Sequence, residues 1–210
     1  MTVKRAIDRK YQIITQRLNK IREIEKVIAS DKKMTLSDFL DMLTQLLEEN
    51  GITFVIAGGF ARSIHAALRA TSDIDIVIAT QDKNKLEALL KNNNFKLKDI
   101  LDYTKPTRRI IKYEYNDGYE VDILDFAKFP SFTSFLLKTS INRHPHSFLG
   151  IDGLIITKLC SFRYKDNADL IDLLHSTESN INMDIIKEWC AALGIMDRFS
   201  FLSQTHENED

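Results

Sequence analysis

Residues 54–78 read FVIAGGFARSIHAALRATSDIDIVI, and three features of this segment organise the rest of the chain. A short apolar run at residues 52–57 has the β-branched content of a buried strand, and Gly58 and Gly59 break it. A helix-like segment follows, and a second apolar run then carries Asp73 and Asp75. The pattern predicts two strands separated by a glycine loop and a helix.

The glycine doublet predicts an anion site. Backbone N–H groups at such a loop face whatever lies there, and the N-terminus of the helix behind it favours negative charge. A triphosphate fits this description. Arg62 and Arg69 are further candidates for phosphate contact, because guanidinium groups form bidentate pairs with phosphates.

Asp73 and Asp75 are predicted to form a metal site. Successive side chains of a strand point to opposite faces, so the two carboxylates share one face and the isoleucines between and after them share the other. Neighbouring carboxylates repel each other unless a cation lies between them, and Mg²⁺ binds one or two carboxylates together with substrate phosphate oxygens. The pair therefore indicates a Mg²⁺ site beside the phosphate loop.

The composition is that of a globular protein. A length of 210 residues suits one large or two small domains, and 44% hydrophobic residues suffice for a core. No apolar run reaches the length of a signal or membrane segment, so we expect a cytoplasmic protein without a membrane partner. Cys160 and Cys190 lie in apolar segments without metal-ligand spacing, which predicts buried, reduced thiols.

Positive charge is unevenly distributed along the sequence. Residues 1–33 contain ten Lys or Arg and four acids, and residues 83–112 contain nine and three, although the net charge is only -1. Such regions attract a nucleic-acid backbone or a nucleotide, or else they are solvated helix faces balanced elsewhere. Both interpretations stay open.

Amphipathic periodicity predicts a long helix over residues 3–28 and a second over residues 36–47. Thr35 or Ser37 is the expected N-cap of the second helix, and Gly51 ends it. Beyond the Asp73–Asp75 strand, residues 83–93 are expected to form a helix. Residues 95–101 are expected to form a short strand.

Residues 108–126 predict a β-hairpin, because two segments rich in β-formers flank Asn-Asp-Gly at 116–118. On the second arm, Glu120 and Asp122 share one face. If this arm pairs beside the strand of Asp73 and Asp75, Asp122 joins the two aspartates as a third carboxylate. Three carboxylates can hold two metal ions, one on the nucleophile and one on the leaving phosphate oxygens. The alternative is an exposed strand face with solvated acids.

From residue 129 onward the pattern is helical. Residues 139–150 are predicted to be a connector, whose His144 and His146 are polar surface residues or a metal pair. The expected fold is α+β, a mixed β-sheet flanked by helices, preceded by a long N-terminal helix and followed by a C-terminal helical bundle. The expected domains are residues 1–128 and 129–210.

Two sets of residues resemble known motifs. Gly58-Gly59 followed after thirteen residues by Asp73-Ile74-Asp75 resembles the signature of the DNA polymerase β-like nucleotidyltransferase superfamily, and Asp122 is placed like its third carboxylate. Lys158, then Arg163, then Lys-Asp-Asn-Ala-Asp-Leu at residues 165–170 resemble the C-terminal motifs of abortive-infection (AbiEii-like) nucleotidyltransferases, the toxin halves of type IV toxin–antitoxin pairs. The resemblance covers residues 52–174 and implies a nucleotidyltransferase-type sheet.

The resemblance also implies a role for each motif residue. Gly58 and Gly59 would hold the triphosphate, and Lys158 would reach the phosphates of the bound nucleotide. Asp73 and Asp75 would bind the metal, and Asp122 would bind a second metal and the attacking hydroxyl. Asp166 or Asp169 would orient the lysine or the acceptor.

One departure from the motif concerns the glycine loop. Many members of the superfamily have serine where this chain has Gly59, and that hydroxyl helps to hold the terminal phosphate. In this chain the backbone, or Ser63 one turn later, would have to replace it.

The expected activity is Mg²⁺-dependent transfer of an NMP from an NTP onto a hydroxyl of tRNA or protein, an EC 2.7.7-type reaction that uses one or two ions. If the chain is a toxin, a cognate antitoxin is the expected partner. One alternative is an antibiotic-modifying enzyme similar to lincosamide or aminoglycoside nucleotidyltransferases. Another is a non-catalytic RNA- or protein-binding module, against which the presence of all three candidate carboxylates argues.

Overall fold

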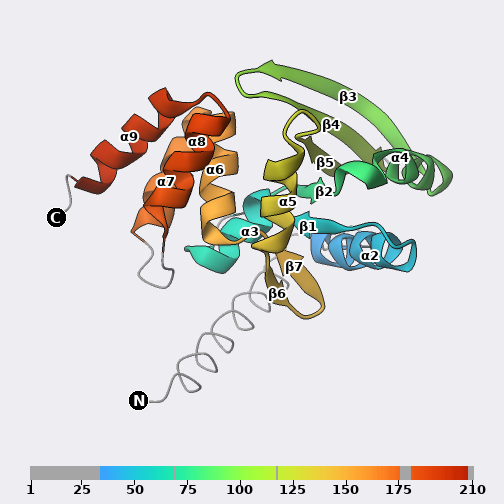
Figure 1. The fold of residues 1–210 in the computed structure, drawn as a ribbon. Helices are drawn as coiled ribbons and strands as arrows, with labels where there is room; N and C mark the ends of the chain where they lie inside the picture. The colour runs from blue at the N-terminus through green and yellow to red at the C-terminus, as the bar shows by residue number, and fades with distance from the viewer. Residues whose placement is uncertain (1–33, 69, 117, 176–180, 208–210) are drawn as a thin grey trace.

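The computed structural model describes residues 34–68, 70–116, 118–175 and 181–207 (Figure 1). Its centre is a seven-stranded mixed sheet in the order β3-β4-β5-β2-β1-β7-β6. The strands are β1 (Phe54–Ile56), β2 (Asp73–Ile78), β3 (Phe95–Thr104), β4 (Thr107–Tyr115), β5 (Tyr119–Asp125), β6 (Ile141–Arg143) and β7 (His146–Phe148). The helices are α2 (Leu36–Glu49), α3 (Gly58–His65), α4 (Lys83–Asn92), α5 (Pro130–Lys138), α6 (Ile151–Ser161), α7 (Tyr164–Leu174), α8 (Met183–Ala192) and α9 (Met196–Glu207), with a 3-10 turn η1 (Thr80–Asp82).

The glycine-loop segment folds as its sequence predicts. β1 and β2 pair antiparallel with Val55 opposite Val77, and both side chains are completely buried. Gly58 starts α3 immediately after β1, so the chain leaves the sheet at the glycine doublet and returns to it at Asp73. The predicted α2 also forms, with a capping box in which Thr35 and Asp38 exchange hydrogen bonds.

The predicted hairpin is confirmed and provides the neighbour of β2. β4 and β5 pair antiparallel, with Tyr115 opposite Tyr119 at the turn. β5 then runs parallel to β2 with Asp75 opposite Asp122. β3 was expected to be short but extends over ten residues, because β4 offers it a pairing partner along nearly its whole length.

Residues 139–150 were predicted as a connector, and this prediction was wrong. They form the β6–β7 hairpin, and β7 joins the sheet parallel to β1 with Ile56 opposite Phe148. His146 is buried rather than a surface residue, and its Nε2 lies 2.8 Å from Asp41 Oδ1 on α2. The division at residues 128 and 129 stays a prediction, although the sheet contains strands from both sides of it.

Helices α6–α9 gather at one side of the sheet and α2 and α4 at the other (Figure 1). One hydrophobic cluster runs from Phe39 on α2 to Leu202 on α9 and includes the inward residues of β1, β2 and β5. The α+β expectation is thereby confirmed for the described part of the chain, while the predicted helix over residues 3–28 lies outside it. No helix among the described residues combines the length and the apolar character needed to cross a membrane.

Candidate active site

Asp73, Asp75 and Asp122 form one cluster. β2 places the first two on the same face, and the parallel register of β2 and β5 sets Asp122 directly beside Asp75. One carboxylate oxygen from each of the three residues lies within 4.8 Å of the others. The alternative of an exposed strand face is not what the structure shows, because Asp122 is only 5% exposed.

Gly58 brings the start of α3 against this cluster. Its φ is +55°, a conformation that L side chains rarely adopt, and a Cβ there would lie 1.7 Å from Asp75 Oδ2. The backbone therefore approaches the carboxylate at a distance that only glycine permits. The N-cap residue Ala57 gives this helix N-terminus no side-chain hydrogen bond, and an anion beside the aspartates would accept from its first N–H groups.

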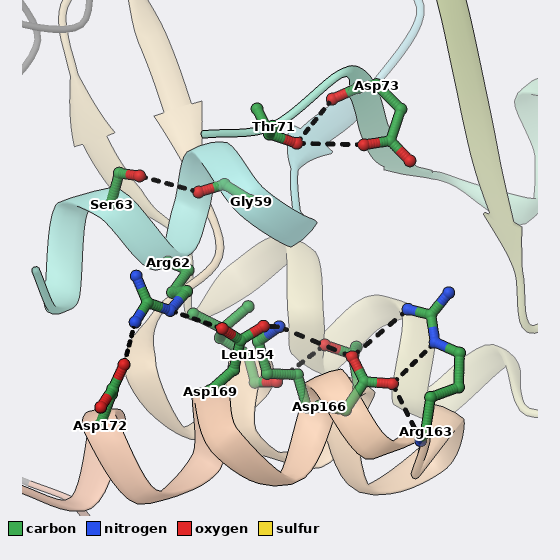
Figure 2. Close-up of polar contacts among 12 residues, drawn as sticks. Gly59, Arg62, Ser63, Thr71, Asp73, Leu154, Arg163, Asp166, Asp169 and Asp172 are labelled. Atoms are coloured by element: carbon green, nitrogen blue, oxygen red, sulfur yellow. Dashed lines mark hydrogen bonds and ion pairs between the residues drawn. The ribbon is translucent and has the colours of Figure 1, made fainter. Parts of the chain in front are cut away.

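Thr71 occupies the space next to the second glycine. A Cβ on Gly59 would lie 2.5 Å from Thr71 Oγ1, so no side chain fits there without moving the threonine. Thr71 Oγ1 also donates to Asp73 Oδ1 at 3.0 Å (Figure 2). Ser63 is the predicted replacement for the missing hydroxyl. Its side chain is buried and instead donates to the Gly59 carbonyl at 3.0 Å.

Burial and neighbouring negative charge raise the pKa values of Asp75 and Asp122. Burial, and then the charges of Asp73 and Asp122, raise the pKa of Asp75 to about 7. Burial also raises the pKa of Asp122, although Lys112 Nζ, 2.6 Å from Asp122 Oδ2, opposes this shift. The cluster is thus short of positive charge in the absence of a cation.

Lys158 on α6 lies at the middle of a chain of alternating charges. Its Nζ is 2.6 Å from Asp169 Oδ2 and 3.8 Å from Asp166 Oδ1. Asp169 Oδ1 lies 2.7 Å from Arg62 Nε, and Asp166 Oδ2 lies 2.8 Å from Arg163 Nε. Because each buried charge has an opposite neighbour, the ammonium group is held in place rather than free to reorient.

Arg62 was predicted to contact phosphate, but its guanidinium is used elsewhere. It pairs with Asp169 and Asp172 on α7 and donates to the Ala67 carbonyl. It is 2% exposed and does not line the pocket described next. Arg69 lies outside the described residues.

A pocket of about 150 Å³ lies between the sheet and helices α6 and α7. It contains both glycines, all three aspartates and Lys158, so segments up to a hundred residues apart in sequence meet there. Asp166 also lines the pocket, whereas Asp169 contacts the pocket through its ion pair with Lys158. The remaining lining residues are Thr71, Ile110, Lys112, Leu124, Leu154, Thr157, Ser161, Arg163 and Lys165.

Thr71, Lys112 and Lys165 were not predicted as site residues. Lys112 could have been found from the sequence, because counting back from an antiparallel turn at residues 116–118 places it opposite Asp122. Thr71 could not, because its contact with Gly59 depends on how the loop after α3 returns to the sheet.

A divalent metal ion fits this cluster. Asp122 Oδ1 is buried and, within the described residues, has no hydrogen-bond partner. A buried acceptor without a partner is costly, and a cation shared with Asp73 and Asp75 would satisfy it. Three carboxylates are hard oxygen donors of the kind that Mg²⁺ and Mn²⁺ prefer.

Comparisons with known proteins found likenesses in structure alone. No family model and no curated protein matches the sequence. An antigenic nucleotidyltransferase-like protein from Paracoccidioides brasiliensis is 20% identical, with 82% of this chain and 92% of that chain covered and a TM-score of 0.44. ANT(2″)-Ia in complex with adenylyl-2″-tobramycin is 14% identical, with 82% and 97% covered and a TM-score of 0.44.

A third solved structure is similar to this chain at the same level. The lincosamide antibiotic adenylyltransferase LnuA, with lincomycin bound, is 16% identical, with 66% of this chain and 96% of that chain covered and a TM-score of 0.42. The structural neighbours are thus nucleotidyltransferases or similar to them. Likenesses at this level assign neither an activity nor a substrate to this chain.

Proposed function

We propose that this chain is an EC 2.7.7-type nucleotidyltransferase that moves an NMP from an NTP onto an acceptor hydroxyl. The observation that carries the proposal is the convergence of three aspartates, the glycine doublet at the N-terminus of α3 and Lys158 on one pocket. A triphosphate requires N–H donors and positive charge, and a transfer at its α-phosphate requires a cation site beside them.

The protein's own groups would bind and orient the nucleotide. Gly58, at the start of α3, and Lys158 both line the pocket, where the first N–H groups of the helix and the ammonium would hold phosphate oxygens. Asp166 and Asp169 hold the Lys158 ammonium in position through ion pairs, so little reorganisation is needed when the nucleotide arrives.

Asp73, Asp75 and Asp122 would hold the metal. Mg²⁺, when bound, supplies positive charge to the phosphate oxygens and lowers the pKa of a coordinated hydroxyl. Thr71 fixes the Asp73 carboxylate through its hydroxyl, and Lys112 fixes that of Asp122. We assign Asp122 to the acceptor hydroxyl, as the motif resemblance implies.

For the acceptor we propose a hydroxyl of tRNA or protein in the cytoplasm, and for the biological role the toxin half of a type IV toxin–antitoxin pair with a cognate antitoxin. This part of the proposal is supported by the resemblance of Lys158, Arg163 and residues 165–170 to the abortive-infection motifs. It is separate from the chemistry, which depends on the pocket alone.

The test is transfer of label from each of four α-labelled NTPs, with Mg²⁺, into separate pools of tRNA, protein and small-molecule hydroxyls. We expect transfer by the wild-type chain, and a loss of at least about 10²-fold in Asp73→Asn and Asp75→Asn, which keep side-chain shape but remove the charge. Glu188→Gln, an exposed acid on α8, is the matched control and should transfer normally.

No transfer by the wild-type chain into any pool would refute the enzymatic proposal. Transfer into antibiotics but not into tRNA or protein would refute the proposed acceptor and role. Equal transfer by wild type and Asp73→Asn would refute the assignment of the site.

A further inference from the structure

Lys112, Asp122 and Asp75 form a row across three neighbouring strands. Lys112 on β4 is directly opposite Asp122 on β5, and Asp122 is directly opposite Asp75 on β2. Directly paired residues share a face of the sheet, so all three side chains project into the same pocket. The row places an ammonium group at the edge of the carboxylate cluster.

The two oxygens of Asp122 have different surroundings. Oδ2 accepts a hydrogen bond from Lys112 Nζ at 2.6 Å, which is short and charge-assisted. Oδ1 is buried without a hydrogen-bond partner among the residues described. The side chain of Asp122 is 7% exposed and that of Lys112 is 23% exposed, so water screens this pair only weakly. One oxygen is thus already satisfied by a cation and the other is not.

The charges of the cluster point to a single ion. With an ion bound and all three aspartates ionised, the carboxylates carry three negative charges, which one divalent ion and the Lys112 ammonium together would balance. A second divalent ion would have to take Asp122 Oδ2 from Lys112 and leave the ammonium beside two metal ions. Like charges so close together in a partly buried site are strongly unfavourable.

We propose that Lys112 takes the place of a second metal ion. In this arrangement one divalent ion is shared by Asp73, Asp75 and the Oδ1 atom of Asp122, and Lys112 supplies the remaining positive charge through Oδ2. The inference deepens the proposed function and rests on it for the presence of a metal. It departs from the two ions that three carboxylates can hold when no lysine is present.

The test counts ions directly. Metal-free full-length chain is titrated with Mn²⁺ by calorimetry, and the loaded protein is examined by electron paramagnetic resonance, in which two neighbouring Mn²⁺ ions give a spin-coupled spectrum. Wild type should bind one ion at the cluster and show an uncoupled spectrum. Lys112→Met should bind two ions and show coupling, because Asp122 Oδ2 becomes available.

Two further variants separate the role of this lysine from a general loss of charge. Lys165→Met removes a positive charge from the same pocket, and Lys112→Arg keeps a cation on Asp122. Both should bind one ion with the wild-type spectrum. Two ions, or none, in the wild-type chain would overturn the inference, as would a single ion in a Lys112→Met variant with a native circular dichroism spectrum.

The inference and the proposed function fail in different ways. A wild-type chain that transfers NMP and binds two ions refutes only the role of Lys112. A wild-type chain that binds one ion and transfers nothing refutes only the proposed activity.

Discussion

Replacing Gly58 with alanine is expected to destabilise the protein by about 2–5 kcal/mol. The φ of +55° costs an L residue about 1–2 kcal/mol. The new Cβ would also lie 1.7 Å from Oδ2, 2.4 Å from Cγ and 2.8 Å from Cβ of Asp75. Since the last of these atoms cannot rotate away, the backbone or the strand must shift, and such overpacking costs about 1–3 kcal/mol more.

Gly194 provides a matched control for the backbone contribution. Its φ is +70°, and nothing lies within 4 Å of a Cβ built there, so Gly194→Ala should cost only about 1–2 kcal/mol. The difference between the two variants isolates the contact with Asp75. In a chain of this size each kcal/mol lowers Tm by about 2–4 °C.

Urea denaturation followed by circular dichroism measures both free energies of unfolding. Repeating Gly58→Ala in an Asp75→Ala background removes the two closest atoms and should recover part of the difference, whereas the contact with the Cβ of residue 75 at 2.8 Å remains. Gly58→Ala should also weaken Mn²⁺ binding, because the carboxylate it displaces is a proposed ligand. If Gly58→Ala and Gly194→Ala destabilise equally in both backgrounds, α3 does not start against Asp75 as the structure has it.

Three further predictions concern ionisation and the packing of the C-terminal helices. The metal-free protein should lose stability as pH rises from about 4 to about 7, because the pKa of Asp75 is about 7 in the folded state and 3.8 ordinarily, so the folded state binds more protons in this range. Thermal denaturation measures this dependence, and Asp75→Asn should flatten it. Burial raises the pKa of both thiols, Cys160 and Cys190, to about 12, so a thiol reagent such as DTNB should label them at pH 8 only in denaturant, and rapid labelling of the native chain would contradict their burial. Arg198 donates to the last carbonyls of α6 and to the Lys105 carbonyl at the β3–β4 tip, so Arg198→Met should destabilise the protein by about 2–4 kcal/mol and speed hydrogen exchange at that tip. Lys105→Met removes one exposed ion pair and should cost at most about 1 kcal/mol.

Much of the sheet near the site was predictable because its signals are local. The glycine doublet ends β1, alternation puts Asp73 and Asp75 on one face, and the turn at residues 116–118 sets the register of β4 and β5. These three features depend on residues that are neighbours in sequence, and at that range the hydrophobic periodicity and the turn residues are informative.

The less predictable parts all involve contacts distant in sequence. β7 pairs with β1 across some ninety intervening residues, and its short, partly polar sequence resembles a connector. Arg62 follows the glycine loop as a phosphate ligand would, yet Asp169 and Asp172 draw its guanidinium away. A local sequence pattern shows which charged groups are available, but not which oppositely charged group will pair with each of them in the fold.

The sequence by itself determined the chemistry available to this protein, namely a glycine loop, an aspartate pair on one strand face, a third aspartate on a hairpin and a helical lysine. Tertiary structure alone decided how these groups are partnered. It placed Asp75 against Gly58, Thr71 against Gly59 and Lys158 between two buried aspartates. The physical reason is that burial makes each charge depend on its nearest neighbour in space, and only the packed fold chooses that neighbour.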